Sequence, residues 1–506
     1  MRKLLVILTI LVFAKGYAQK IPNPVPYAKT ITADDLKKHL YIIAGKDMEG
    51  RETATEGQRK AAAYIENHFR SIGLKAGNNN SFQMMYPVFQ DSLTKATLEI
   101  NDKSFALDKD FAVGGTGYNF SLMGSEVAFA GYGISDSLRD DYKGINARGR
   151  IVLIFGGTPP VTGNNQRRPS SQASIIEAAQ RNGAAAILLV QPGFPRRPGN
   201  VRGNQYLNAF RRTNNPNTFF ISEDVAKTIL GTDFSAASEG IKNGNAQSKI
   251  YTANVKLELN RISTSVESSN VLGFLEGTDK KDEWVVLTAH YDHLGKRGDS
   301  IVYFGADDDG SGTVSILELA EAFAKAKEAG KGPRRSMLFM TVSGEEKGLW
   351  GSAYYGDHPA FPLDKTTVNL NIDMIGRIDP KRKIGDSLNY VYVVGDDKLS
   401  TDLRPISEAM NKKYTKLELD YKYNDPKDME RIYFRSDHYN FARKGVPIIF
   451  YFNGTHNDYH RPTDTPDKIN YPLMAKRAQL VFYTAWEMAN RNDMLKRDLS
   501  LDVGNR

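Results

Sequence analysis

The chain contains no cysteine in its 506 residues. This absence excludes disulfide bridges, iron–sulfur clusters, thiol nucleophiles and cysteine-ligated zinc fingers, and it leaves the cellular compartment open. Beyond the amino terminus, no apolar run approaches the length of a transmembrane helix. The net charge of +8 is not gathered into a compact basic motif, so nothing favours a nucleic-acid partner.

The remaining composition is that of a globular protein. Hydrophobic residues make up 41% of the chain and charged residues 25%, both of which are ordinary values. A chain of this length is too long for one ordinary domain, so two or three domains are expected.

Residues 1–18 have the features of a secretory signal peptide. A basic start precedes a short apolar run, and the small residues Gly16 and Ala18 stand before Gln19. The apolar run is too short to span a bilayer comfortably. We therefore expect an exported protein, periplasmic or extracellular, with no stable membrane insertion.

Changes in the hydrophobic pattern along the chain predict its domain borders. Residues 19–118 begin with two amphipathic helices, and residues 119–256 alternate short strands with turns. Residues 257–490 alternate buried strands with helices, which predicts a three-layer α/β/α domain with a mostly parallel sheet. Residues 491–506 form a polar tail that is expected to be loose.

Polar side chains follow the strand expected over Val285–Ala289. His290, Asp292 and His293 come directly after it, and Asp307–Asp309 precede a helical pattern. Three adjacent carboxylates repel one another, which favours a nearby cation, although a solvated acidic loop is the alternative for these aspartates alone. In an open α/β sheet, sites form outside the carboxyl ends of the strands.

Three further strands end in the same kind of residue. Glu345 and Glu346 follow one strand, Asp373 follows the next, and Tyr459 and His460 follow the last. Imidazole and carboxylate ligands without thiolate suit zinc, with cobalt or manganese as possible substitutes. The four strand ends together therefore predict a metal site.

These segments read HYDHLG, GADDDGSG, SGEEKGLWGS, NIDMIG and YH. In this order they resemble metallopeptidase family twenty-eight, the co-catalytic di-zinc aminopeptidases and glutamate-carboxypeptidase-like enzymes. The resemblance covers residues 257–490 and the amino-terminal helices of 19–118, which would complete one zinc exopeptidase domain. Residues 119–256, with VAFAGYGI and GRIVLIFGG, look like an inserted protease-associated domain.

The resemblance implies a site for two Zn²⁺ ions per chain. Its ligands would be His290, Asp308 as the bridge, Glu346, Asp373 and His460. Asp307 is a near alternative for the bridge. The resemblance also implies a cis peptide bond between Asp308 and Asp309.

Other residues take supporting roles in this scheme. Glu345 would be the general base towards a water shared by the metals, and Asp292 would orient His290. Tyr459 fits an oxyanion donor. His293 is expected to pack or to face substrate. His438 and His456 are expected to support the site or line its pocket, because the ligand set is complete without them.

The resemblance thus predicts an exported di-zinc aminopeptidase that acts on peptides. A carboxypeptidase or dipeptidase of the same family is the nearest alternative. A single-zinc glutaminyl cyclase and a receptor-like ectodomain without metals are also possible, but the full ligand set and Glu345 argue against both.

Overall fold

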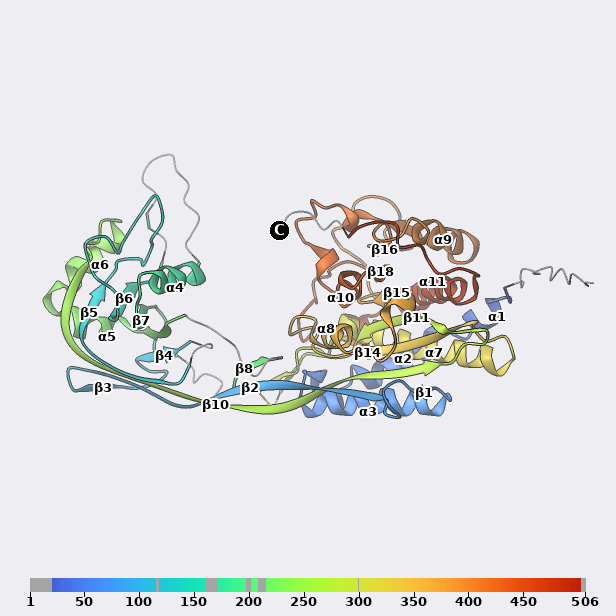
Figure 1. Ribbon diagram of the computed structural model, residues 1–506, viewed down its shortest axis with the longest axis horizontal. Helices are drawn as coiled ribbons and strands as arrows, with labels where there is room; N and C mark the ends of the chain where they lie inside the picture. The colour runs from blue at the N-terminus through green and yellow to red at the C-terminus, as the bar shows by residue number, and fades with distance from the viewer. Residues whose placement is uncertain are drawn as a thin grey trace, which may run out of the picture. The chain divides into compact units, whose positions relative to one another are not determined.

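The computed structural model describes most of the chain (Figure 1). The described residues are 21–114, 118–157, 159–160, 171–196, 202–207, 215–298 and 300–501. The expected signal peptide, residues 1–18, lies outside them. Two compact units are formed: the first unit comprises Met1–Tyr86 and Glu267–Arg506, and the second unit comprises Pro87–Val266.

A mostly parallel sheet forms the centre of the first unit. β14, β11, β15 and β18 run parallel to one another, whereas β10 is antiparallel to β14 and β16 is antiparallel to β18. Every residue of β14, β15 and β18 is buried, which is typical of a sheet covered on both faces. The strands lie in the order β17 (Glu418–Asp420), β16 (Tyr390–Val394), β18 (Ile448–Phe452), β15 (Thr366–Ile372), β11 (Lys280–His290), β14 (Arg335–Val342) and β10 (Lys249–Leu275).

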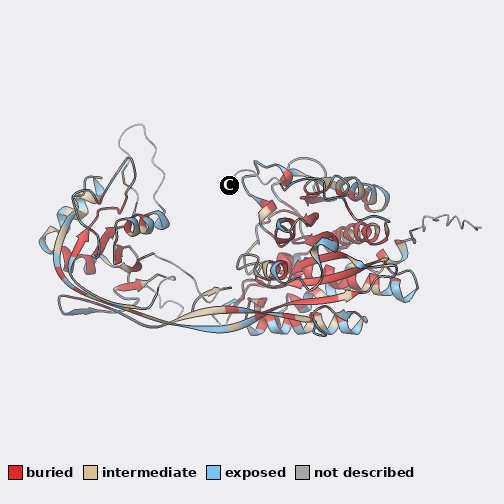
Figure 2. Ribbon diagram, viewed as in Figure 1, coloured by how far each residue is buried: buried red, intermediate tan, exposed pale blue. Residues whose placement is uncertain are grey.

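Helices cover the two faces of this sheet. Val285 and Leu287 of β11 belong to one core and Trp284 and Val286 to another, because alternate residues of a strand face opposite sides. The first core is covered by α2 (Ala33–Ile43), α3 (Glu56–Ser71), α7 (Gly312–Glu328), α9 (Leu403–Met410) and α11 (Tyr471–Asn490); the second is covered by α8 (Trp350–Asp357) and α10 (His438–Arg443). Figure 2 shows the buried residues concentrated in the strands. The predicted α/β/α architecture is confirmed.

The second unit has cores of its own, and its strands continue the hydrogen-bonded order from β10. β5, β6, β7 and β9 are parallel, β4 pairs antiparallel with β9, and β10 pairs antiparallel with β5. The elements are β3 (Lys103–Phe105), β4 (Phe111–Val113), β5 (Phe120–Phe129), β6 (Ile151–Phe155), α4 (Gln172–Arg181), β7 (Ala186–Val190), β8 (Arg202–Tyr206), β9 (Asn217–Ile221), α5 (Glu223–Leu230) and α6 (Phe234–Lys242).

The chain passes between the units within two long strands, β2 (Gln83–Ile100) and β10. The compact second unit is therefore longer than the insertion expected at 119–256, whose end would fall inside β10. The carboxyl-terminal border is hidden in the sequence because residues 262–265, in the middle of β10, are all exposed and lack an apolar alternation. That the insertion is a protease-associated domain stays a prediction.

Residues 491–501 are held against the first unit, so the expectation of a loose tail is wrong for this stretch. Leu495 is buried, and its amide donates to Thr367 Oγ1 at 2.9 Å. Arg497 donates to two carbonyl oxygens, those of Leu363 and Thr366, at 2.7 Å. Within the described part of the chain, no helix is both long and apolar enough to cross a membrane.

Candidate active site

The predicted polar side chains meet at one edge of the first unit's sheet. His290 ends β11, the glutamates follow β14, Asp373 follows β15, and His460 lies beyond β18. Because these four strands are parallel, their carboxyl ends lie at the same edge. Two groups of potential ligand atoms result, and Asp308 belongs to both.

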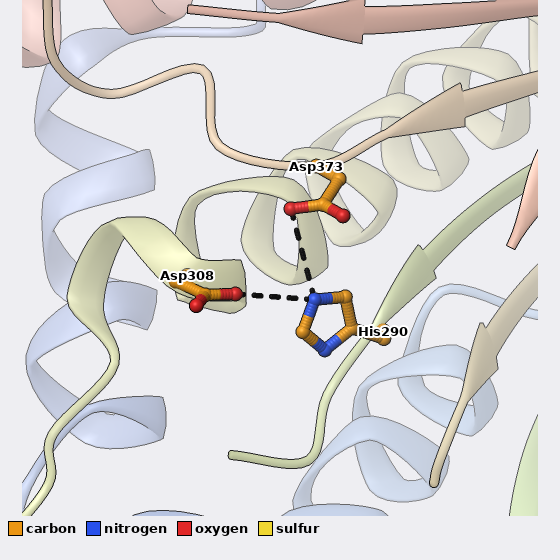
Figure 3. Close-up of side chains that lie close together, drawn as sticks. All are labelled: His290, Asp308 and Asp373. Carbon is orange, nitrogen blue, oxygen red and sulfur yellow. Dashed lines mark ion pairs between the residues drawn. The ribbon is translucent and has the colours of Figure 1, made fainter. Parts of the chain in front are cut away.

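The first group consists of His290, Asp308 and Asp373, which point toward one another (Figure 3). His290 Nε2 lies 3.3 Å from Asp308 Oδ1 and 3.7 Å from Asp373 Oδ1. The other ring nitrogen, Nδ1, is 3.1 Å from the main-chain oxygen of Asp292. The Nδ1 edge of the imidazole is therefore held at the backbone, and the Nε2 edge points to the two carboxylates.

The second group consists of His293, Asp308 and Glu346, and His460 lies beside it. His460 Nε2 lies 3.1 Å from Asp308 Oδ2 and 3.1 Å from Glu346 Oε2. His293 Nδ1 lies 2.7 Å from Glu346 Oε1 and 3.9 Å from Asp308 Oδ2. His293 therefore joins the predicted residues, although packing or substrate contact was expected of it.

The donor set fits a bound cation. His290 Nε2, His293 Nδ1, Asp308 Oδ2 and Glu346 Oε1 are buried and have no hydrogen-bond partner. Leaving such atoms unpaired is costly, because a buried charge needs a partner or a metal. Imidazole nitrogen and carboxylate oxygen are ligands that zinc accepts. The five residues of the implied set would hold the metal here.

Asp307, the alternative bridge, points elsewhere. Its Oδ1 accepts the amide of Gly376 at 2.7 Å, and its Oδ2 lies 3.2 Å from His456 Nε2. It belongs to neither group of ligand atoms found among the described residues. The geometry therefore favours Asp308 as the residue between the two groups.

Asp309 joins three elements behind the ligands. Its carboxylate accepts the amides of His290, Gly312 and Met374 at 3.2, 2.9 and 3.0 Å. Burial, with the charge of Asp373, raises the pKa of Asp309 well above its ordinary value. The peptide bond between Asp308 and Asp309 is cis, as expected.

Asp292 connects the loops around His290. Its Oδ2 accepts from Thr53 Oγ1 at 2.7 Å, and its Oδ1 accepts the amide of Glu345 at 3.2 Å. The same Oδ1 lies 3.6 Å from His290 Nδ1, farther than the main-chain oxygen. Asp292 thus orients His290 mainly through its backbone, while its carboxylate positions Glu345.

A buried arginine, Arg51, ties together the loops that carry the ligands. Its guanidinium is fully buried and donates to the carbonyl oxygens of Tyr291, Ile43, Phe304 and Gly305 at 2.7–2.9 Å. Burial lowers the pKa of Arg51 to about 10, and nearby aspartates oppose that shift. Nothing in the sequence distinguishes this arginine from a surface one, so it was missed.

The two adjacent glutamates experience different surroundings. Burial, together with the charges of Asp373 and Glu346, raises the pKa of Glu345 well above its ordinary value. Burial acts in the same direction on Glu346, but the imidazoles of His293 and His460 prevail and lower its pKa. Such a separation of neighbouring carboxyl groups is typical of distinct chemical roles.

A pocket opens beside these groups. Its apolar walls and its polar side are formed by Met374, Ile432, Phe450, Phe452, Thr455, Asp308, Glu345, Asp373, Arg435 and Tyr459. Arg435 donates to the hydroxyl oxygen of Tyr459 at 3.0 Å. Burial and the charge of Asp308 raise the pKa of Tyr459, so the phenol keeps its proton.

Two other histidines and an aspartate near the site are buried. His438 Nε2 lies 2.8 Å from the oxygen of Tyr433, and its ring stacks on Phe450. His456 Nδ1 accepts the amide of Asp458 at 3.2 Å. Asp437 is fully buried, and burial raises its pKa to about 7. Asp437 carries no separate signal in the sequence, and neither histidine belongs to a ligand group.

The α/β/α fold thus carries two groups of potential metal ligands at the carboxyl ends of its parallel strands. Residues 270–485 match the model of peptidase family M28. The resemblance to this family is thereby confirmed, whereas the protease-associated insertion stays a prediction.

Curated relatives have names in keeping with this family. A probable leucine aminopeptidase of Arthroderma otae is 31% identical over 219 residues, 42% of this chain and 56% of the relative. A probable zinc metalloprotease of Pyrenophora tritici-repentis is 25% identical over 309 residues, 53% of this chain and 60% of the relative. The chain thus spans little more than half the length of these relatives.

Solved structures share the fold over nearly the whole chain. An aminopeptidase from Aneurinibacillus sp. strain AM-1 gives a TM-score of 0.57 at 20% identity, covering 93% of this chain and 97% of that one. A zinc aminopeptidase from Bacillus subtilis gives 0.55 at 19% identity, covering 96% and 100%.

Proposed function

We propose that this chain is a zinc exopeptidase with two metal ions that removes amino-terminal residues from peptides. The observation that carries the proposal is the pair of buried ligand groups sharing Asp308. A shared carboxylate holds two cations about 3.5–4 Å apart in two-metal hydrolases, where bound zinc activates water and polarises the peptide carbonyl.

Glu345 moves the proton in this scheme. It lines the pocket, and its Oε2 lies 3.9 Å from His290 Nε2. Its raised pKa lets it accept a proton from the attacking water and pass that proton to the leaving amine. Glu346, whose pKa is lowered, stays an anionic ligand.

Tyr459 donates to the oxyanion that forms on the substrate carbonyl. Arg435 already donates to the phenol oxygen, so the hydroxyl proton remains available for the substrate. A donor aimed at developing negative charge typically contributes about 10²–10³ to the rate.

The pocket composition supports cleavage at a free amino terminus. Because Asp308 and Asp373 are proposed metal ligands, the Glu345 carboxylate and the Tyr459 phenol oxygen are the pocket groups left to accept from a substrate ammonium group. Met374, Ile432, Phe450 and Phe452 offer an apolar wall beside them. We therefore propose a preference for large apolar amino-terminal residues, in keeping with the name of the leucine aminopeptidase relative.

The direct test is a peptide pair that differs only in its amino terminus. Purified protein should release leucine from Leu-Gly-Gly but leave acetyl-Leu-Gly-Gly intact, as followed by mass spectrometry. A chelator should abolish turnover, and added zinc should restore it. Turnover that persists without metal would overturn the proposal.

A carboxypeptidase is the second candidate, because Arg435 places a cation at the pocket. A guanidinium binds a carboxylate well, including the carboxyl terminus of a peptide. Release of carboxyl-terminal glycine from the blocked peptide would favour this candidate. At most one tightly bound ion in active protein would instead favour the single-zinc cyclase.

Export is proposed from residues 1–18. The mature protein should begin near Gln19, and amino-terminal sequencing of material from the periplasm or medium tests this. An intact amino terminus on cytoplasmic protein would overturn it.

A further inference from the structure

His293 is held in a defined place beside the second ligand group. Its side chain is fully buried, and its amide donates to the oxygen of Arg51 at 3.3 Å. Gly305 adopts a φ of +55°, and a Cβ atom at that position would lie 2.4 Å from His293 Cγ. Gly305 therefore leaves the room that the imidazole occupies, and any other residue there would displace the ring.

The ring nitrogen Nδ1 approaches two carboxylates without being satisfied by either. It lies 2.7 Å from Glu346 Oε1 and 3.9 Å from Asp308 Oδ2. Despite the short distance, neither Nδ1 nor Oε1 has a hydrogen-bond partner. His293 Nδ1 and Glu346 Oε1 are close but lack the geometry of a hydrogen bond. Such an arrangement is expected of two ligand atoms that point to the same metal ion.

His460 approaches the same carboxylates from another side. Its Nε2 lies 3.1 Å from both Asp308 Oδ2 and Glu346 Oε2, and its ring centroid is 5.9 Å from that of His293. Glu346 thus presents one oxygen to each imidazole. Two imidazole nitrogens and two carboxylates therefore surround the second cation position, which is the one beside Glu346. The first cation position, beside Asp373, has one imidazole and two carboxylates.

We propose that His293 is a further ligand of the second cation, binding through Nδ1 beside Asp308, Glu346 and His460. The inference rests on the proposed two-ion site. Four protein donors still allow a fifth partner, because catalytic zinc expands to five-coordinate geometry. With two imidazoles, the second position should discriminate more strongly than the first against manganese, which prefers oxygen ligands.

Imidazole ligation can be counted directly with cobalt. In protein loaded with two Co²⁺ ions, the remaining N–H of each bound imidazole gives an exchangeable, paramagnetically shifted proton signal. We expect three such signals, from His290, His293 and His460, and the loss of one in His293→Gln. Two signals that His293→Gln leaves unchanged would overturn the proposal.

Zinc affinity provides a second readout. For His293→Gln, competition with a fluorescent chelator should show one of the two ions bound more than about 100-fold more weakly. Loss of a residue that only supports a ligand typically costs about 10–100-fold. The matched control is His68→Gln, since His68 Nε2 is also buried without a partner but belongs to neither group; its zinc affinity should be unchanged.

Stability without metal separates ligation from packing. In excess chelator, His293→Gln should differ from the parent in its urea midpoint far less than it does in zinc, because metal ligation is then absent from both proteins. A clear loss of stability in chelator together with unchanged zinc affinity would make His293 a packing residue. Absence of any bound divalent ion in the parent would instead defeat the proposed function itself.

Discussion

At the scale of single residues, Glu345 and Glu346 are neighbours with opposite surroundings. Glu345→Gln keeps shape and hydrogen bonding but cannot accept a proton, so kcat should fall by about 10²–10⁴. Both metal ions should stay bound, because Glu345 lies in neither ligand group. Steady-state kinetics and elemental analysis of the same preparation measure the two effects.

Glu346→Gln is the matched comparison. It removes the charge of a predicted ligand, so metal content should fall together with activity, and excess zinc should restore part of both. If Glu345→Gln lost metal while Glu346→Gln kept both ions, the two roles would be exchanged.

Tyr459→Phe removes one hydroxyl from the pocket. We expect kcat to fall by about 10²–10³ with KM and metal content nearly unchanged, because the hydroxyl acts on charge that develops only in the transition state. The control is Tyr64→Phe, which removes a hydroxyl from helix α3, outside the pocket. Equal kcat values for Tyr459→Phe and the parent would remove Tyr459 from the mechanism.

At the scale of elements, Arg51 joins the loops after β11 and before α7 to the amino-terminal segment. Lysine at this position cannot satisfy four carbonyl oxygens, and each unsatisfied buried group costs about 1–3 kcal/mol. Arg51→Lys should therefore lower the free energy of unfolding by more than about 2 kcal/mol, measured by urea denaturation, and weaken zinc retention.

The control for that substitution is Arg70→Lys on helix α3. Arg70 is largely exposed; its guanidinium donates to Glu66, one helical turn away, and lies over the ring of Phe82. Its replacement should change the free energy of unfolding by less than about 0.5 kcal/mol. Similar effects of the two substitutions would mean that Arg51 does not secure the ligand loops.

The elements that the sequence predicted well are those with continuous apolar runs. A strand is expected over Val285–Ala289, and the structure has β11 there, from Lys280 to His290. β10 was missed, because its exposed middle lacks the alternation that a half-buried strand shows. The local sequence pattern does not predict a strand whose residues are exposed and held only by hydrogen bonds to a neighbouring strand.

The sequence predicts which site residues lie at the strand ends, but it does not predict the side-chain contacts that these residues make. His290 and Asp373 follow buried strands, so their convergence follows from the parallel sheet. His293 lies only three residues from His290, but its ring direction depends on Gly305, which no local pattern reveals. The role of Arg51 cannot be predicted from the sequence either, because its hydrogen-bond partner Tyr291 lies 240 residues away.

At the scale of the whole molecule, metal should stabilise one unit selectively. All residues of the two ligand groups belong to the first unit. Zinc present at 100 times its dissociation constant would add about 2.7 kcal/mol to the stability of that unit. Calorimetry should show chelator lowering one unfolding transition and leaving another, that of the second unit, in place; an unchanged profile would contradict this.

Acid should weaken the protein through His438. Burial lowers the pKa of His438 to about 3, from 6.5 for an unperturbed histidine. The unfolded chain therefore binds the proton more readily, and the stability present above pH 6.5 is lost as pH falls toward 3. By pH 5 this loss amounts to about 2 kcal/mol.

Comparison with His438→Gln isolates that contribution from the carboxyl groups, which titrate in both proteins. The variant should be less stable at pH 7, because its packing on Phe450 is lost. Its urea midpoint should nevertheless fall less between pH 7 and pH 5 than that of the parent. Parallel pH profiles would exclude His438 as the source of acid sensitivity.

The passage of the chain through β2 and β10 has a consequence for synthesis on the ribosome. Helices α2 and α3 emerge early, but their core partners in α7 and β11 follow only after the second unit. Arg51 must wait for Tyr291, 240 residues later. The second unit's cores lie wholly within Pro87–Val266, so it can fold as soon as that segment emerges. The proposed ligand set is therefore complete only after His460 has left the ribosome, close to the end of synthesis.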